Sequence, residues 1–158
     1  MIARVSIPPD LLEEIRRHAA STYPEECCGF LIGEASESHR TIHRISPAPN
    51  RVASERERRY VIPPDELRSL ETELEGSGAQ VLGFYHSHPD HPARPSRFDR
   101  DHAWPWYTYV VVNVTQEGAG TAGAFELDAD SLEFREVPIA LHGPSPQPLS
   151  NGGVSESS

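Results

Sequence analysis

The stretch from Val81 to Asp99 reads VLGFYHSHPDHPARPSRFD. It contains the candidate functional residues around which we interpret the rest of the chain. Its first part is apolar or aromatic up to a His-x-His pair, which is typical of a buried strand that ends in polar side chains. Side chains alternate between the two faces of a strand, so His86 and His88 should point the same way. The three prolines that follow exclude regular structure and bend the chain, so that Asp99 can return to the two imidazoles.

Two imidazoles and a carboxylate in this arrangement predict a metal site. Three protein ligands without an obvious fourth are typical of a catalytic zinc, whose open position holds water, rather than of a closed structural site. A more ordinary interpretation is that Ser96 and Asp99 only form the N-terminal cap of a short helix. The two interpretations are compatible, because capping would fix the direction of the Asp99 carboxylate. We therefore expect one zinc ion per chain, bound by His86, His88 and Asp99.

A second metal motif overlaps the first. The run from His86 to His91 also matches His-x-His-x-Asp-His, the dinuclear metal motif of the metallo-β-lactamase superfamily. That fold is a large two-sheet sandwich that needs further ligands well downstream, but the only histidines after His91 are His102 and His142. The short remaining length argues against a dinuclear site, and we expect Asp90 and His91 to be loop residues.

Length and composition are those of a globular protein with one domain. The chain has 158 residues, of which 37% are hydrophobic, and no apolar run is long enough to span a membrane. The N-terminus lacks the apolar segment of a signal peptide, so a cytoplasmic protein is expected. The net charge of −10 argues against a nucleic-acid backbone as partner.

Helix and strand signals alternate along the chain. Two amphipathic helices begin at prolines, the first ending before Pro24 and the second running from Pro64 to Gly76. A short helix at Asp99 should reach His102 or Ala103. Apolar or alternating segments predict strands at 29–33, 41–46, 60–62, 81–88, 107–114, 122–127 and 132–137. This order predicts a single domain of the α/β (α+β) class.

The polar segment 47–59 contains the charged run from Ser54 to Arg59. Most such runs are solvated loops whose charges pair locally. The alternative is a binding flap that presents arginines to the carboxylates of a partner. The arginines concerned are Arg51, Arg56, Arg58 and Arg59, and the sequence leaves both interpretations open.

A hydrolytic metal site also needs a general base. Glu25 and Glu26 stand directly before the apolar segment 29–33, and strongly apolar strands of an α/β sheet are usually neighbours, so a carboxylate here could overhang the metal. Spacing alone does not distinguish the two glutamates, and a solvated pair in a loop is the ordinary interpretation. Cys27 and Cys28 follow. Adjacent cysteines rarely form a strain-free disulfide, so two buried free thiols are expected.

Taken together, these motifs resemble the signature of the JAMM (MPN+, Mov34/PAD-1) metalloproteases. Glu26 is followed three residues later by Gly29, the His-Ser-His-Pro run comes next in order, and seven residues separate His88 from Ser96-x-x-Asp99. The similarity extends over most of residues 4–139. The chain is most similar to the short stand-alone members from bacteria and archaea.

The resemblance implies a fold and a domain boundary. A JAB/MPN-type domain would span residues 1–140, with a mixed central β-sheet flanked by helices in layers like those of the cytidine deaminases. Residues 141–158, which are rich in Pro, Ser and Gly, would follow as a disordered tail.

The resemblance also assigns a role to each motif residue. His86, His88 and Asp99 would bind zinc, which can lower the pKa of bound water from about 15.7 to about 7. Glu26, which has the family's spacing, would act as general base and then as general acid, and Ser96 would stabilise the oxyanion. No covalent intermediate is expected.

Some stand-alone members process ubiquitin-like sulfur-carrier proteins by cutting after a terminal Gly-Gly. The resemblance therefore implies a zinc peptidase or isopeptidase that acts after the Gly-Gly of a ubiquitin-like or sulfur-carrier protein. From charge and composition, neither nucleic acid nor membrane is expected as a partner. Two alternatives stay open. One is a non-catalytic MPN-type binding module, and the other is a zinc-dependent amidase or a metallo-β-lactamase-like hydrolase of a small molecule. The sequence carries no signal for the oligomeric state.

Overall fold

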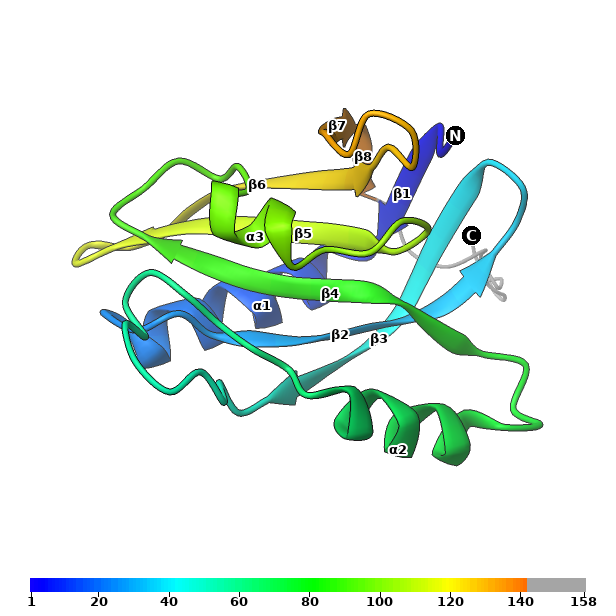
Figure 1. Cartoon of the computed structure of the whole chain (residues 1–158), viewed down its shortest axis with the longest axis horizontal. Helices are drawn as coiled ribbons and strands as arrows, with labels where there is room; N and C mark the ends of the chain where they lie inside the picture. Colours follow the sequence, from blue (N-terminus) through cyan, green and yellow to red (C-terminus); the bar gives the residue numbers. More distant parts are fainter. Residues whose placement is uncertain (142–158) are drawn as a thin grey trace, which may run out of the picture.

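An eight-stranded mixed β-sheet organises the chain (Figure 1). The structure is a computed structural model that describes residues 1–141. The strand order is β7-β6-β5-β4-β2-β3-β1-β8, so β4, which ends in the His-x-His pair, lies near the middle of the sheet. The strands are β1 (Arg4–Ile7), β2 (Cys28–Ala35), β3 (His39–Ala48), β4 (Gln80–Pro89), β5 (Thr108–Thr115), β6 (Gly118–Leu127), β7 (Phe134–Val137) and β8 (Ile139–Leu141).

Two long helices cover the opposite faces of the sheet (Figure 1). Helix α1 (Pro9–Thr22) buries its predicted apolar stripe against one face, and α2 (Pro64–Leu74) buries its leucines against the other. Side chains of β2 alternate between the two hydrophobic cores. Leu31 packs in the core with α1, whereas Phe30 and Ile32 pack in the core with α2. No helix within residues 1–141 is both long and apolar enough to cross a membrane.

The pairing of β4 brings the start of β2 to the His-x-His pair. β4 runs antiparallel to β2 and parallel to β5, and Cys28 lies opposite His86. The contact continues past the ladder, because the Cys27 N–H donates to Ser87 Oγ at 2.8 Å and the Ser87 N–H donates to the Cys27 carbonyl at 3.2 Å. The prediction that these two apolar strands are neighbours in the sheet is therefore confirmed. Cys27 and Cys28 are both free and buried, as expected.

The α+β fold class predicted from the sequence is confirmed, but several elements differ in detail. Residues 60–62 do not form a strand, because Val61 is paired with the loop around Asn50: its N–H donates to Asn50 Oδ1 and its carbonyl accepts from the Arg51 N–H. The strand expected over 132–137 begins only at Phe134, because Leu132 lies in a turn with a φ of 60°.

The two strands β1 and β8 were not predicted from the sequence. They pair with each other in parallel, and β1 also pairs with β3. Leu141, expected as the first residue of a tail, is the last residue of β8. The rest of that expected tail lies outside the described residues.

Candidate metal centre

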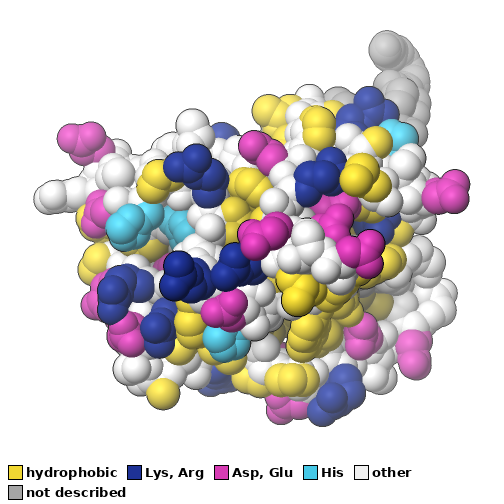
Figure 2. Space-filling model, turned by 45° about the horizontal axis from the view of Figure 1, so that its top comes forward, with side chains coloured by type: hydrophobic (Ala, Val, Ile, Leu, Met, Phe, Trp, Pro, Cys, Tyr) yellow, Lys and Arg dark blue, Asp and Glu magenta, His cyan; other side chains and the backbone are white. Residues whose placement is uncertain are grey.

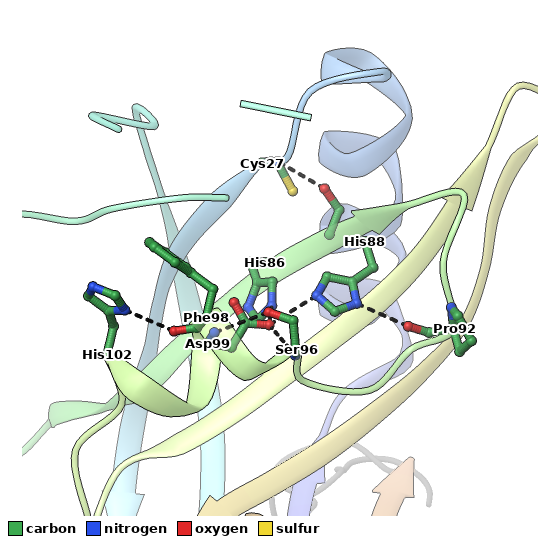
Figure 3. Close-up of polar contacts among 9 residues, drawn as sticks. Cys27, His86, His88, Pro92, Ser96, Phe98, Asp99 and His102 are labelled. Atoms are coloured by element: carbon green, nitrogen blue, oxygen red, sulfur yellow. Dashed lines mark hydrogen bonds and ion pairs between the residues drawn. The ribbon is translucent and has the colours of Figure 1, made fainter. Parts of the chain in front are cut away.

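The end of β4 and the start of helix α3 (Arg97–Asp101) bring together the three predicted ligands (Figure 3). His86 Nε2 and His88 Nε2 each lie 3.0 Å from Asp99 Oδ2. The three ligand atoms lie within 4.8 Å of one another, and all three residues are buried. Within residues 1–141 this is the only group of three or more His, Cys, Asp or Glu side chains suited to a metal ion.

A capping box holds the Asp99 carboxylate in place. Ser96 Oγ accepts from the Asp99 N–H at 3.1 Å, and the Ser96 N–H donates to Asp99 Oδ2 at 2.8 Å. This is the reciprocal cap that the sequence indicated, with an aspartate at the third helical position. The cap therefore fixes the direction of the ligand, and the two interpretations of this segment hold together.

The hydrogen-bond geometry of His88 suits a cation. His88 Nδ1 lies 3.1 Å from the carbonyl oxygen of Pro92, which can only accept, so Nδ1 carries the proton. In a neutral imidazole Nε2 then has a lone pair, and this lone pair faces another acceptor, the Asp99 carboxylate. A cation between them removes the repulsion. Tetrahedral zinc with bonds near 2.0 to 2.1 Å needs ligand atoms about 3.3 Å apart, so the donor set and the spacing fit zinc.

The charge states of the cluster also suit a metal. Burial lowers the pKa of His86 despite the neighbouring carboxylate, which favours the neutral imidazole that ligates metals. Burial alone would raise the pKa of Asp99, but the two imidazoles and the Ser96 N–H hold it well below its usual range. His86 Nδ1 and Asp99 Oδ1 are buried and have no hydrogen-bond partner among the described residues. A bound cation would compensate part of this cost.

The structure separates the two glutamates that the sequence could not. Glu25 is exposed, whereas Glu26 is only 3% exposed and its Oε1 has no partner in the described part of the chain. Burial, with a smaller contribution from the Asp99 charge, raises the pKa of Glu26 to about 9. A cation at the ligand cluster would favour its charged form.

The backbone of Glu26 is tied to the loop that follows β3. Its N–H donates to the Arg56 carbonyl at 2.7 Å, and its carbonyl accepts from Asn50 Nδ2 at 3.3 Å. The same Asn50 amide donates to the Arg59 carbonyl at 2.8 Å. The loop is therefore part of the site, because it fixes the chain that carries the buried carboxylate.

Two cavities have residues of the cluster in their walls. One, of about 440 Å³, is lined by Glu26, His88 and Ser96 together with arginines and prolines. The other, of about 410 Å³, is lined by Asp99 and mainly by aromatic and apolar residues, among them Tyr60 and Trp104. The proposed base, a ligand and the Ser96 hydroxyl thus share one accessible space.

Three contacts of the site were missed from the sequence. The Tyr60 ring stacks on His86, with centroids 4.4 Å apart and an interplanar angle of 23°. The Pro92 carbonyl sets the tautomer of His88, and Ser87 fixes the backbone beside Glu26. Alternation along β4 could have indicated that Ser87 points away from the histidines. No local signal indicated the other two contacts.

Other titratable residues near the motif lie apart from the ligands. Asp90 accepts from the Tyr23 hydroxyl at 2.9 and 3.0 Å, and His91 is exposed, so neither belongs to the cluster. His102 Nδ1 contacts the Phe98 carbonyl at 2.9 Å. The structure therefore places Asp90 and His91 in a loop, as expected, and brings no second metal cluster together among residues 1–141.

Comparison with known proteins identifies the family of this chain. The family model described as prokaryotic homologs of the JAB domain matches residues 8–127. The desampylase of Haloferax volcanii is 35% identical over 144 residues, which cover 88% of this chain and 97% of that protein. The probable TtuB-protein conjugate cleaving protease of Thermus thermophilus is 35% identical over 105 residues, or 66% of this chain and 67% of that one.

A solved structure is also similar to this chain in fold. The solution structure of a protein from Desulfitobacterium hafniense matches with a TM-score of 0.76 and 27% identity, covering 89% of this chain and 94% of that one. The matched family model extends from the start of α1 to the end of β6 and includes the ligand cluster. The chain therefore belongs to the prokaryotic branch of the JAB/MPN domain family.

Proposed function

We propose that this chain is a JAMM-type zinc metallopeptidase that hydrolyses the bond after the C-terminal Gly-Gly of a ubiquitin-like or sulfur-carrier protein. The observation that carries the proposal is the buried cluster of His86, His88 and Asp99 beside the buried carboxyl of Glu26. Similarity to a desampylase and to a probable TtuB-protein conjugate cleaving protease supports the substrate class. We assign this activity to a domain that spans residues 1–140.

The contacts of each residue support its proposed role. His86, His88 and Asp99 would hold the zinc ion, which as a Lewis acid lowers the pKa of a water molecule and polarises a carbonyl. The Glu26 carboxylate accepts a proton from the attacking water and then donates it to the leaving amine. Ser96 Oγ accepts a backbone N–H, so its own hydrogen remains available to donate to the developing oxyanion.

The surroundings keep these groups in position. The capping box orients Asp99, and the Pro92 carbonyl keeps the His88 lone pair directed at the cluster. The pairing of Cys27 with Ser87 fixes the chain next to Glu26. Burial of the ligands limits access of bulk water, which strengthens the electrostatic interactions within the site.

A Glu26→Gln variant tests the proposal directly. The variant keeps the shape of the side chain but cannot accept a proton, so we expect it to retain about one zinc per chain and to lose turnover by about 10² to 10⁴-fold. The substrate is a Gly-Gly-tailed carrier protein fused through its C-terminus to a reporter, and elemental analysis gives the zinc content.

Asp99→Ala provides the comparison, because a site reduced to two imidazoles should release the metal. Full turnover by Glu26→Gln would exclude Glu26 as the base. A folded wild-type protein that takes up no zinc would exclude the hydrolase and favour the non-catalytic binding module. Such a module should bind its partner equally well with or without the Glu26 substitution.

A further inference from the structure

Four arginines line the cavity that opens onto Glu26, His88 and Ser96. Arg58 and Arg59 come from the loop between β3 and α2, and Arg94 and Arg97 come from the segment between β4 and the start of α3. Figure 2 shows dark blue arginine side chains gathered around cyan histidines on the side where β4 ends in Figure 1. We call these four residues the arginine mouth.

The arginine mouth contrasts with the charge of the whole chain. The chain carries 24 acidic and 14 basic residues, with a net charge of −10. Among the residues that line this cavity, Glu26 is the only acid, and it is buried. A local positive field therefore surrounds the opening of the metal centre on an otherwise acidic molecule.

The arginines of the mouth are only partly neutralised. Arg58 and Arg59 share one carboxylate, that of Glu55. Arg94 and Arg97 are exposed, and neither side chain has a hydrogen bond or ion pair with any residue in the range 1–141. These two guanidinium groups are available to a ligand.

One guanidinium of the mouth packs on an aromatic ring. The Arg59 guanidinium lies over the Phe98 ring, with its carbon 4.5 Å from the ring centroid. Phe98 lies between Arg97 and Asp99 in α3, so this contact joins the two segments of the mouth beside the metal ligands. Planar guanidinium groups with several donors bind carboxylates in defined geometries.

We propose that the arginine mouth binds carboxylate side chains of the protein substrate within a few residues of the bond that is cleaved. This inference rests on the proposed function, and it narrows the substrate to conjugates of a ubiquitin-like or sulfur-carrier protein with an acidic segment next to Gly-Gly. The net charge of the chain repels an acidic partner, whereas the arginine mouth attracts one to the opening of the site.

Binding of two labelled peptides tests the inference separately from catalysis. One peptide carries three glutamates before Gly-Gly and the other carries three glutamines, and both end in an amide-linked reporter. Fluorescence anisotropy is measured with the zinc-loaded full chain in the Glu26→Gln background, so that turnover does not disturb the titration. Cleavage of the same peptides is measured with Glu26 present.

The test variant is Arg94→Gln with Arg97→Gln, which removes the two arginines that have no partner. The matched control is Arg17→Gln with Arg68→Gln, which makes the same change of charge at exposed positions on α1 and α2. Zinc content and circular dichroism show whether each variant is folded. Any difference between the two double variants then depends on position rather than on net charge.

We expect the acidic peptide to bind about tenfold more tightly than the neutral one at low salt. This preference should fall to about twofold in the Arg94 and Arg97 variant or at 0.5 M salt, and it should persist in the control. Equal affinity of the two peptides, no binding of either at about 1 mM, or an equal loss in both double variants overturns the inference. So does tighter binding of a single-stranded oligonucleotide than of the acidic peptide.

The two proposals can fail independently in this experiment. Charge-dependent binding without cleavage by the zinc-loaded wild type supports the arginine mouth and contradicts the proposed hydrolysis. Cleavage of both peptides with equal kcat/KM supports the hydrolysis and contradicts the arginine mouth.

Discussion

Ser96 serves two purposes at the residue scale, and its substitutions can separate them. Ser96→Ala removes the side-chain cap, which should lower the free energy of unfolding by about 1 kcal/mol. It also removes the hydroxyl donor, which should lower kcat by about 10² to 10³-fold. Ser96→Thr keeps both groups and serves as the control. Urea denaturation and steady-state kinetics measure the two effects, and an alanine variant with wild-type kcat would show that Ser96 only caps α3.

The same residues show what a sequence can predict about a site. The relation of Ser96 to Asp99 is local, because a capping box depends on four consecutive residues, and it could be predicted. The choice between Glu25 and Glu26 depends on which of them the fold buries. Asn50 and the Arg56 carbonyl hold the Glu26 backbone through hydrogen bonds, and both residues lie far along the chain from it. From the sequence alone, Glu26 is favoured only because its spacing to Gly29 is that of the family which the sequence resembles.

At the element scale, close contact between β2 and β4 explains why residue 29 is a glycine. An added Cβ at Gly29 would lie 2.3 Å from the ring of the fully buried Tyr85. Gly29→Ala should therefore displace the Tyr85 ring and disturb the pairing of β2 with β4, and lower the free energy of unfolding by about 1 to 3 kcal/mol. It should also reduce kcat, because this pairing sets Cys28 opposite His86 and so positions the start of β2, which Glu26 precedes. Thermal denaturation and kinetics provide the measurement.

Gly76→Ala is the matched control for this substitution. Gly76 has a φ of 77° and no atom within 4 Å of an added Cβ, so alanine there should cost about 1 kcal/mol through backbone strain alone and leave kcat unchanged. If Gly29→Ala behaved in the same way as Gly76→Ala, the contact with Tyr85 would not position the site.

Elements with strong local patterns were predictable, and elements that depend on distant partners were not. Helices α1 and α2 show an apolar stripe after a proline, and β4 and β5 show long apolar runs. By contrast, β1 and β8 are four and three residues long and form only because they pair across most of the chain. Residues 60–62 have strand-like side chains, but the Asn50 side chain and the Arg51 N–H make the hydrogen bonds that a neighbouring strand would provide.

At the scale of the whole molecule, the metal centre is a concentration of buried polar groups at one end of an apolar sheet. Glu26, His86, His88 and Asp99 are all at most 6% exposed, and several of their polar atoms have no partner among residues 1–141. Burying such groups costs free energy that the cores on both faces of the sheet must offset. A cation that binds only the folded chain would stabilise it.

Removal of zinc should therefore reveal a pH dependence that belongs to Glu26. Its pKa in the folded chain is about 9, whereas an unfolded glutamate titrates near pH 4.3. The stability due to the buried neutral carboxyl is fully present below about pH 4.3 and is lost as the pH rises toward 9. Between pH 5 and 7 the free energy of unfolding of metal-free wild type should fall by about 2 kcal/mol more than that of Glu26→Gln, as measured by urea denaturation with a chelator. Saturating zinc should reduce this difference, because a nearby cation favours the carboxylate. Equal slopes without metal would contradict the burial of an ionisable carboxyl beside the ligands.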